Sequence, residues 1–470
     1  DLPIQHWFFE RIHIDPQHWN QSLLLRVATR VDRVLFERAV QRLMNHHDAL
    51  RARFVPVAGA VRQEIAPVVV EPPVDWVEIA DSTEEEILRH IEQRADRAHR
   101  AFELDRGPLV RFLYFSIPSA LGDRLLVLAH HLVVDVVSWQ ILIEDLESML
   151  AALEGTAGVA QPERTTSLGR WAARLAEYAG TAEVAAQAEH WLGLDSEVEV
   201  PTDFSADKTE NTVETAFSVS LDLDVAETSR LLTEVPKALR SQANEALLAA
   251  LATTLTRWTG RSVCRIDLEG HGREPLFDDV DLSRTVGWLT TVFPVELKVG
   301  GDRSAAAAVR AIQAQLRAIP ARGIGYGLLR YLSPTASSGL SGLPRSLVCF
   351  NYLGRIDALG SHGRRLSPVL WNVGTVRSPT GRRPYLIELD VHVEAGRLIA
   401  VWTASQRFHR RETIAGLAEQ FRAMLRDIVA AAETGSVTAT PDDFPLADLD
   451  AGDLESLSRM IETSERQREP

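Results

Sequence analysis

Two adjacent histidines at the end of an apolar run are the first residues of this chain whose types and spacing suggest chemistry. His130 and His131 are followed by Asp135, and then by Ser138 and Trp139. An imidazole at the end of a buried strand can transfer protons near neutral pH. Because adjacent strand residues point to opposite faces, only one ring can face a given cavity, and we expect the other to be structural. Asp135, just beyond the strand, is positioned to fix the loop by pairing with an arginine.

A second polar group follows another apolar run, SVCRIDL. The segment 267–274 presents Glu269, His271 and Arg273 through two glycines, which suit a tight exit from a strand. The pattern fits a charged loop at a strand end as well as a second acid–base group, and both interpretations stay open from spacing alone.

A third apolar run ends in Asn351 and Tyr352, a polar pair that either faces a cleft or packs. No metal site is predicted, because the two histidines and Asp135 do not converge and no third strong ligand follows them. The two cysteines, Cys264 and Cys349, lie in apolar runs and are expected to be buried free thiols.

The elements that must position these residues alternate between strands and helices. In the first half we expect strands over 20–28, 109–117 and 124–130, and helices over 33–45, from Ser82 to about Phe102, and over 138–153. Ser82 and Glu85 have the spacing of a capping box. In the second half we expect strands over 213–221, 262–268, 345–351, 385–393 and 397–404, with helices near 224–234, 242–257, 304–317 and 411–432. This shared mixed order predicts an α/β (α+β) protein of two similar units.

The length, net charge and hydropathy of the chain argue against some classes of protein. The chain has 470 residues, enough for two or three domains, and a formal net charge of −15, which argues against a nucleic-acid-binding face. No apolar run reaches the roughly 18 residues of a membrane span, so we expect a cytoplasmic protein that does not bind a membrane. The chain begins at Asp1 without a methionine, as expected of a piece cut from a longer polypeptide.

These segments together resemble the condensation-domain superfamily of nonribosomal peptide synthetases, and more narrowly its epimerization domains. That branch carries PIQxWF, HHxxxDxxSW, EGHGRE, TVGWxT, a Gly-rich GxGYG string and FNYLG, and all six occur here in order between residues 3 and 354. Condensation enzymes usually have glycine after the motif aspartate, whereas this chain has Val136, which favours the epimerization branch.

The resemblance implies two chloramphenicol-acetyltransferase-like subdomains in a V-shaped pseudo-dimer, each a mixed sheet flanked by helices, with a tunnel between them. The expected division is an N-terminal subdomain over 1–165, connecting helices and a linker over 166–210, a C-terminal subdomain over 211–440, and a linker or docking segment over 441–470, with a short helix around 452–462.

The resemblance also implies the activity: inversion, from L to D, of the α-carbon of an aminoacyl or peptidyl thioester on a peptidyl carrier protein. No cofactor of the domain's own is expected, because the substrate arrives on the carrier's 4′-phosphopantetheine arm. The expected partners are an upstream carrier and a downstream condensation domain or next synthetase.

The expected site has a proton-transfer group on each side of the α-carbon. His131 and Glu269 are assigned to these positions, and Tyr352 is a third candidate proton donor or orients the substrate. The residues expected to bind substrate or organise the site are Asn351, Arg273, Asp135, Ser138, Trp139 and His130.

Two alternatives remain. The first is a condensation domain or acyltransferase that forms an amide or ester with His131 as base, which HHxxxD fits equally well. The second is a non-catalytic platform that recruits another enzyme to the carrier. The presence of His131, Asp135 and Glu269 argues against the platform.

Overall fold

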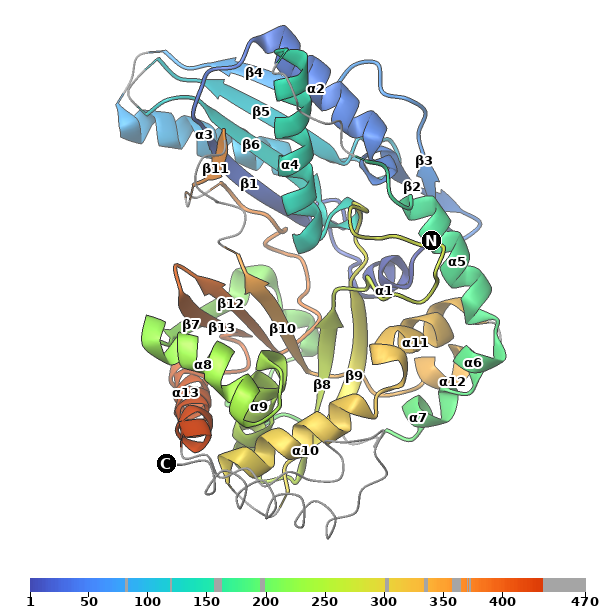
Figure 1. Ribbon diagram of the computed structural model, residues 1–470, viewed down its shortest axis with the longest axis vertical. Coiled ribbons are helices and arrows are strands. Elements are labelled where there is room, and N and C mark those ends of the chain that lie inside the picture. Colours follow the sequence, from blue (N-terminus) through green and yellow to red (C-terminus); the bar gives the residue numbers. More distant parts are fainter. Residues whose placement is uncertain are drawn as a thin grey trace, which may run out of the picture.

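Two mixed β-sheets, one in each half of the computed structural model, organise the chain (Figure 1). The structure describes residues 1–80, 83–118, 121–155, 163–194, 199–300, 304–333, 337–356, 365–369, 371 and 373–433. Each sheet combines parallel and antiparallel pairs and is flanked by helices. The predicted fold class is therefore confirmed.

The first sheet holds the histidine pair. Its strands, in spatial order, are β11 (Leu366–Pro368), β1 (Asn20–Val27), β6 (Arg124–His130), β5 (Val110–Ser116) and β4 (Val74–Glu78). Every residue of β6 is buried, since it lies between β1 and β5 with helices on its faces. These helices are α2 (Arg33–His46), α3 (Glu84–His99) and α4 (Val136–Leu153).

The second sheet holds Glu269. Its strands, in spatial order, are β7 (Ala216–Asp222), β13 (Arg397–Ser405), β12 (Ile387–Glu394), β10 (Val348–Arg355), β8 (Val263–Gly270) and β9 (Thr291–Lys298). The helices α8 (Val225–Ala238), α9 (Ala243–Thr259), α10 (Ala305–Arg317) and α13 (Arg411–Glu433) pack on one another beside it. Alternate residues of β12 are buried, as expected of a strand with one face on a core.

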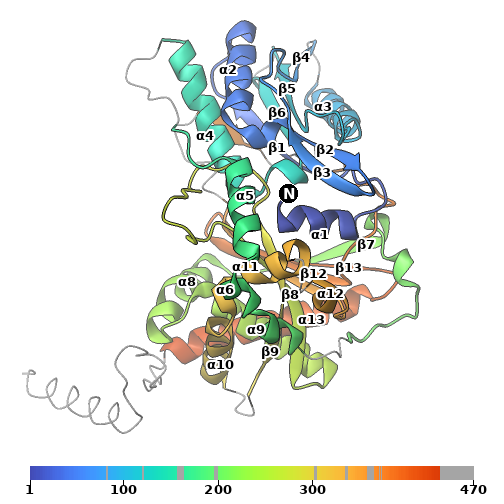
Figure 2. The same cartoon turned by 90° about the vertical axis from the view of Figure 1, so that its right-hand side faces the viewer.

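Several segments join the halves. The helices α5 (Leu168–Ala179), α6 (Ala182–Ala185) and α7 (Ala188–Leu192) run down one side, and α1 (Pro3–Arg11) lies between the halves (Figure 2). The short helices α11 (Ile324–Gly327) and α12 (Ser337–Ser341) lie beside them, and a hairpin of β2 (Ala52–Val57) and β3 (Ala60–Ile65) projects from the first half. The strand β11 comes from the expected 211–440 unit but pairs with β1 of the other half. The second half therefore contributes a strand to the first sheet.

Local sequence explains where the helices begin. Asp32 caps α2 by accepting from the Leu35 amide at 3.0 Å. The capping box of α3 is Thr83 with Glu86, not Ser82 with Glu85 as the sequence suggested. Both pairs have the same spacing, and the side chain actually bonded to the helix is that of Thr83. Ser82 itself and the helix expected around 452–462 lie outside the described residues.

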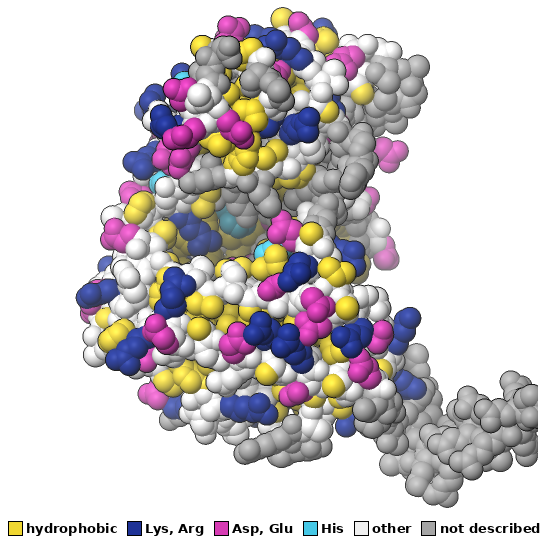
Figure 3. Space-filling view, turned by 90° about the vertical axis from the view of Figure 1, so that its left-hand side faces the viewer, with side chains coloured by type: hydrophobic (Ala, Val, Ile, Leu, Met, Phe, Trp, Pro, Cys, Tyr) yellow, Lys and Arg dark blue, Asp and Glu magenta, His cyan; other side chains and the backbone are white. Residues whose placement is uncertain are grey.

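None of the helices in the described part of the chain is both long and apolar enough to cross a membrane. A hollow separates the halves on one face of the molecule, and basic, acidic and histidine side chains gather around it (Figure 3). The expected proton-transfer residues come from the strand ends on either side of this interface.

Candidate functional site

His130 is the last residue of β6, and its ring belongs to the core. The side chain is completely buried. Its Nε2 donates to the Pro16 carbonyl at 2.7 Å, and its Nδ1 accepts from the Leu132 amide at 3.2 Å. Burial lowers the pKa of His130 to about 3, so the ring is neutral. These bonds occupy both ring nitrogens, which suits the structural role expected of this residue.

His131 turns the other way, at the start of a 3₁₀ turn (His131–Val133). Its Nδ1 lies 2.8 Å from the Val134 carbonyl, which only accepts, so the proton must be on Nδ1. Its Nε2 lies 3.0 Å from the amide nitrogen of Gln21, which therefore donates. The orientation of that amide is fixed because Trp139 Nε1 donates to Gln21 Oε1 at 2.7 Å. The network assigns a neutral ring with the lone pair on Nε2.

The surroundings of His131 favour the neutral form. Burial lowers the pKa of His131 to about 4. Its ring stacks on Trp288 from the second half, with centroids 4.1 Å apart and planes at 28°. At neutral pH this side chain therefore offers an unprotonated nitrogen, the form that a general base requires.

Glu269 is the residue before the last of β8, in the second half. Asn351 on β10 donates from Nδ2 to its Oε2 at 2.8 Å, and Cys349 Sγ lies 3.8 Å from its Oε1. Burial, together with the carboxylates of Asp390 and Glu388, raises the pKa of Glu269 to about 8. The side chain nevertheless has water-accessible surface. The carboxyl group is thus open to water, while Asn351, Cys349 and the acidic side chains of β12 lie around it.

A buried ion pair ties the two strand ends together. Arg273, four residues after Glu269, donates to both oxygens of Asp135 at 2.7 and 3.0 Å. The two side chains are only 9% and 4% exposed. The sequence predicted an arginine partner for Asp135, and the structure supplies one from the other half. The pair brings the loop after β8 onto the loop that carries His131.

Asp135 and Ser138 extend this connection. Asp135 caps α4, accepting from the Ser138 amide at 2.9 Å and from its hydroxyl at 2.8 Å, and also accepts from the Leu289 amide at 3.1 Å. Ser138 Oγ in turn contacts the carbonyl and amide of Gly287, at 3.0 and 3.1 Å. The HHxxxDxxSW segment thus holds the 284–290 loop of the second half.

Gly272 explains why the loop between Glu269 and Arg273 needs a glycine. Its φ is +66°, and a Cβ there would come within 1.6 Å of the Leu289 carbonyl oxygen. No side chain fits this approach. His271, beside it, is exposed, and its Nδ1 accepts from the Arg273 amide at 2.9 Å.

Two acidic residues of β12 belong to the site and were missed from the sequence. In the parallel register of β10 and β12, Cys349 pairs with Glu388 and Asn351 pairs with Asp390, so these side chains share the face of Glu269. Burial and the neighbouring Glu388 raise the pKa of Asp390 to about 6. The alternating sequence IELDVHVE carried the signal, since its polar residues occupy one face and its apolar residues the core.

Tyr352 follows Asn351 on β10, so strand alternation turns it away from the face that carries Glu269. It is half-buried, and burial raises its pKa. Among the described residues the structure records no hydrogen bond from its hydroxyl to His131 or Glu269. Its role as a proton donor stays a prediction.

A different group, His46, His47 and Asp145, has ligand atoms close enough to hold a metal ion. Asp145, however, already accepts from His47 Nε2 at 2.8 Å and from the Arg284 guanidinium. A guanidinium on the same carboxylate disfavours a cation there. Arg284 comes from the second half, so this group is a further connection between the halves.

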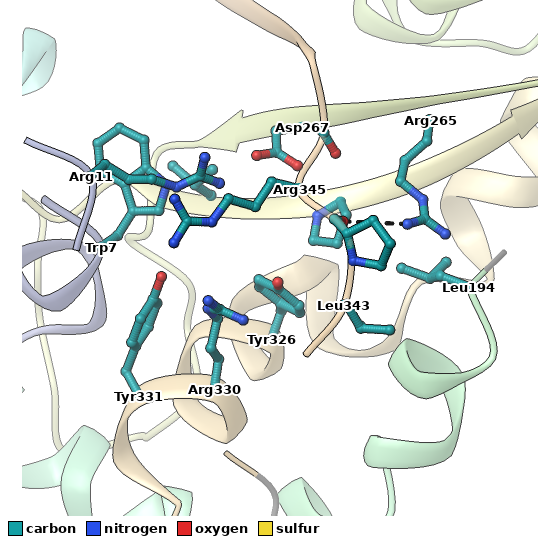
Figure 4. A pocket seen from close by; sticks show the side chains of 14 residues that line it. Trp7, Arg11, Leu194, Arg265, Asp267, Tyr326, Arg330, Tyr331, Leu343 and Arg345 are labelled. Atoms are coloured by element: carbon teal, nitrogen blue, oxygen red, sulfur yellow. Dashed lines mark hydrogen bonds between the residues drawn. The ribbon is translucent and has the colours of Figure 1, made fainter. Parts of the chain in front are cut away.

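A small cavity lies beside the interface, lined by α1, β8 and β9 (Figure 4). Its volume of about 20 Å³ holds about one water molecule. Two of its arginines, Arg330 and Arg345, pair with Glu10, and Arg265 pairs with Glu296. These ion pairs and the small volume make it a structural feature rather than a substrate site.

Comparison with known sequences identifies a matching family and several relatives. The model of the family described as Condensation domain matches residues 2–443. A linear gramicidin synthase of Brevibacillus parabrevis is 38% identical over 456 residues, which are 95% of this chain and 6% of that protein. Surfactin synthase subunit 2 of Bacillus subtilis is 32% identical over 463 residues, 98% of this chain and 13% of that protein. The chain therefore spans only a small part of these relatives.

Solved structures share the fold. The epimerization domain from the third module of tyrocidine synthetase B superposes with a TM-score of 0.84 at 30% identity, covering 92% of this chain and 97% of that one. The X-domain from teicoplanin biosynthesis gives a TM-score of 0.69 at 20% identity, over 93% of this chain and 94% of that one, and shows likeness of fold alone.

Proposed function

The chain belongs to the condensation domain family, and on this premise we propose that it inverts the α-carbon of an aminoacyl or peptidyl thioester held on a peptidyl carrier protein. The observation that carries the proposal is the pair of titratable groups at the interface. His131, from the first half, has a pKa of about 4, and Glu269, from the second, has a pKa of about 8. A neutral base and a neutral acid are what a two-sided proton transfer requires. The similarity to a solved epimerization domain supports the same reaction.

The proposed reaction starts from this resting state. His131 Nε2 takes the α-proton, the C–H electron pair moves onto the thioester carbonyl, and an enolate forms. Glu269 then delivers its proton to the opposite face of the α-carbon. The products are an imidazolium at His131 and a carboxylate at Glu269. This state is prepared for the reverse reaction, and proton exchange with water restores the resting state.

Hydrogen bonds already present favour both steps. The Val134 carbonyl accepts from Nδ1–H and would stabilise the imidazolium formed at His131. The Asn351 amide would stabilise the carboxylate formed at Glu269. Gln21 occupies the lone pair of Nε2, so its amide must move aside when His131 accepts a proton.

The partners in this proposal follow from the family. The substrate would arrive on the 4′-phosphopantetheine arm of an upstream carrier, so the domain needs no cofactor of its own. A downstream condensation domain or next synthetase would accept the product.

The test is exchange of the α-proton with deuterium from solvent. A carrier protein loaded in turn with each proteinogenic L-amino acid, or with dipeptides ending in it, is mixed with the domain in D₂O, and label and configuration are read by mass spectrometry and chiral chromatography. Exchange with at least one thioester is expected. Absence of exchange with every thioester would refute the proposal.

Two variants test whether Glu269 and His131 are the proton-transfer groups. Glu269→Gln and His131→Ala should each slow exchange by about 10²-fold or more, as expected for general acid–base groups. Matched controls are Glu78→Gln and His13→Ala, which make the same changes at exposed side chains. If either site variant kept the wild-type rate, the corresponding residue would be wrongly assigned.

The alternatives predict other products. An amide-forming condensation domain would join a donor and an acceptor carrier substrate, so formation of a new amide without α-proton exchange would favour it. A recruitment platform would bind a loaded carrier and catalyse neither reaction.

A further inference from the structure

The proposed enolate needs a positive charge that the residues described so far do not supply. His131 and Glu269 are neutral at the start, and the carboxyl groups of Asp390 and Glu388 add negative charge beside Glu269. Arg273 is already paired with Asp135. Negative charge developing on a thioester oxygen would be poorly stabilised in such a site without a further donor.

Arg377 is an arginine at this interface whose charge acts on both His131 and Glu269. It lies in the segment that returns from the first half to β12, and forms an isolated antiparallel bridge with Trp19. The neighbouring backbone bonds are Asn20 N to Val376 O at 2.8 Å and Ser378 N to His18 O at 3.0 Å. They fix the backbone of Arg377 against the start of β1, whose residue Asn20 pairs with His130.

The guanidinium of Arg377 is held by an aromatic ring rather than by a carboxylate. It lies 4.0 Å from the centroid of the Trp19 ring. The carbonyl of Trp19 accepts from the His131 amide at 2.9 Å, so the residue that supports Arg377 also supports the base. Within the described ranges, no ion pair is recorded for Arg377, and its charge is available to a ligand.

The charge of Arg377 acts on the groups of both halves. It lowers the pKa of Glu269 and of Asp390 in the second half and that of His131 in the first. The guanidinium of Arg377 is therefore within electrostatic reach of the base in the first half and of the acid in the second.

We propose that Arg377 is a catalytic residue whose guanidinium faces the thioester oxygen and stabilises the enolate, an inference that rests on the proposed function. The electron pair released from the C–H bond moves onto the carbonyl oxygen and is met by the Arg377 N–H donors. It returns when the α-carbon is reprotonated, so Arg377 itself neither gains nor loses a proton. The stacking on Trp19 keeps the charge in place before the substrate binds.

The first test is Arg377→Gln, assayed by α-proton exchange on a loaded carrier. Removing one oxyanion donor slows a reaction by about 10²–10³-fold, and a loss of this size in kcat is expected with a smaller change in KM. The control is Arg382→Gln, five residues on, which removes an exposed arginine from the same segment. A wild-type rate in Arg377→Gln would overturn the proposal.

The second readout distinguishes this role from simple structural support. Because Arg377 lowers the pKa of Glu269, its removal should move the upper limb of the pH–rate profile to higher pH. The groups that face Glu269 and contribute to this limb are Asp390 and Glu388 on β12 and Cys349 on β10. A slow variant whose upper limb does not move would show that Arg377 acts only on the fold.

A conservative variant covers the case in which Arg377→Gln does not fold. Arg377→Lys keeps the charge but loses the planar group that stacks on Trp19, so it should be slower than wild type, faster than Glu269→Gln, and have an unmoved upper limb. If it folded but lost activity as completely as Glu269→Gln, the proposal would be wrong. Absence of exchange in the wild-type domain would instead count against the proposed function as a whole.

Discussion

Replacing Arg273 by methionine tests whether the buried ion pair with Asp135 holds the halves in register. The substitution keeps most of the apolar stem and removes the guanidinium. The two side chains are 9% and 4% exposed, and Asp135 would lose both bonds, at 2.7 and 3.0 Å. Removing one member of such a buried pair costs about 3–5 kcal/mol, because the other charge is left uncompensated.

The hydrogen bonds that Asp135 keeps after the substitution determine where the loss of stability falls within that range. Three donors survive, namely the amide and hydroxyl of Ser138 and the amide of Leu289. They still solvate the carboxylate, so we expect a loss near the lower end, about 3 kcal/mol. With a urea dependence of about 3 kcal/mol per molar, the unfolding midpoint should fall by about 1 M.

Urea unfolding followed by tryptophan fluorescence is a suitable assay, because Trp139 and Trp288 lie at the interface. The matched control is Arg170→Met, which breaks an ion pair with Asp279 that is about half exposed on both sides. Such surface pairs contribute about 0–1 kcal/mol. If Arg273→Met lost less than about 1 kcal/mol, or no more than the control, the buried pair would not be what secures the interface.

Further expectations concern rates. The rate of exchange should rise with pH through about 4 as His131 loses its proton, stay level, and fall through about 8 as Glu269 loses its own; an upper limb near pH 4, the ordinary range of a glutamate, would contradict the assignment. Asn351→Leu removes the donor to the Glu269 carboxylate, so the upper limb should move to higher pH in the same profile; a downward move would contradict this. Gly272→Ala places a Cβ within 1.6 Å of the Leu289 carbonyl oxygen, so circular dichroism should show a folded protein with exchange reduced by about 10-fold or more; unchanged exchange would show that the loop geometry is not needed.

Residues close in sequence were predicted better than residues brought together by the fold. The end of β6 and the helix after Asp135 follow from apolar periodicity and agree with the structure. An arginine partner for Asp135 was expected, but which arginine depends on contacts between residues 138 positions apart. Gln21 was missed because a polar residue within an apolar strand has no local signal for the histidine it meets.

Other differences arise where one local pattern allows several structures. The connecting helices expected over 166–210 include the two short helices α6 and α7, which are separate although the sequence around them is rich in alanine. β12 was predicted as a strand, yet its acidic face became part of the site only because β10 places it beside Glu269. Strand alternation identifies two faces, while the neighbouring elements decide which face meets a cavity.

The pairing of β11 with β1 has a consequence for synthesis of the chain. Until residues 366–368 emerge from the ribosome, the backbone of Leu25, Arg26 and Val27 is an open sheet edge. About 340 residues separate the two strands, and translation at about 5–20 residues per second takes roughly 20–70 s to cover them. An unpaired edge invites association with other chains during that interval. We therefore expect the nascent first half to bind a chaperone during synthesis. A chain truncated before residue 366 should aggregate more than the full chain.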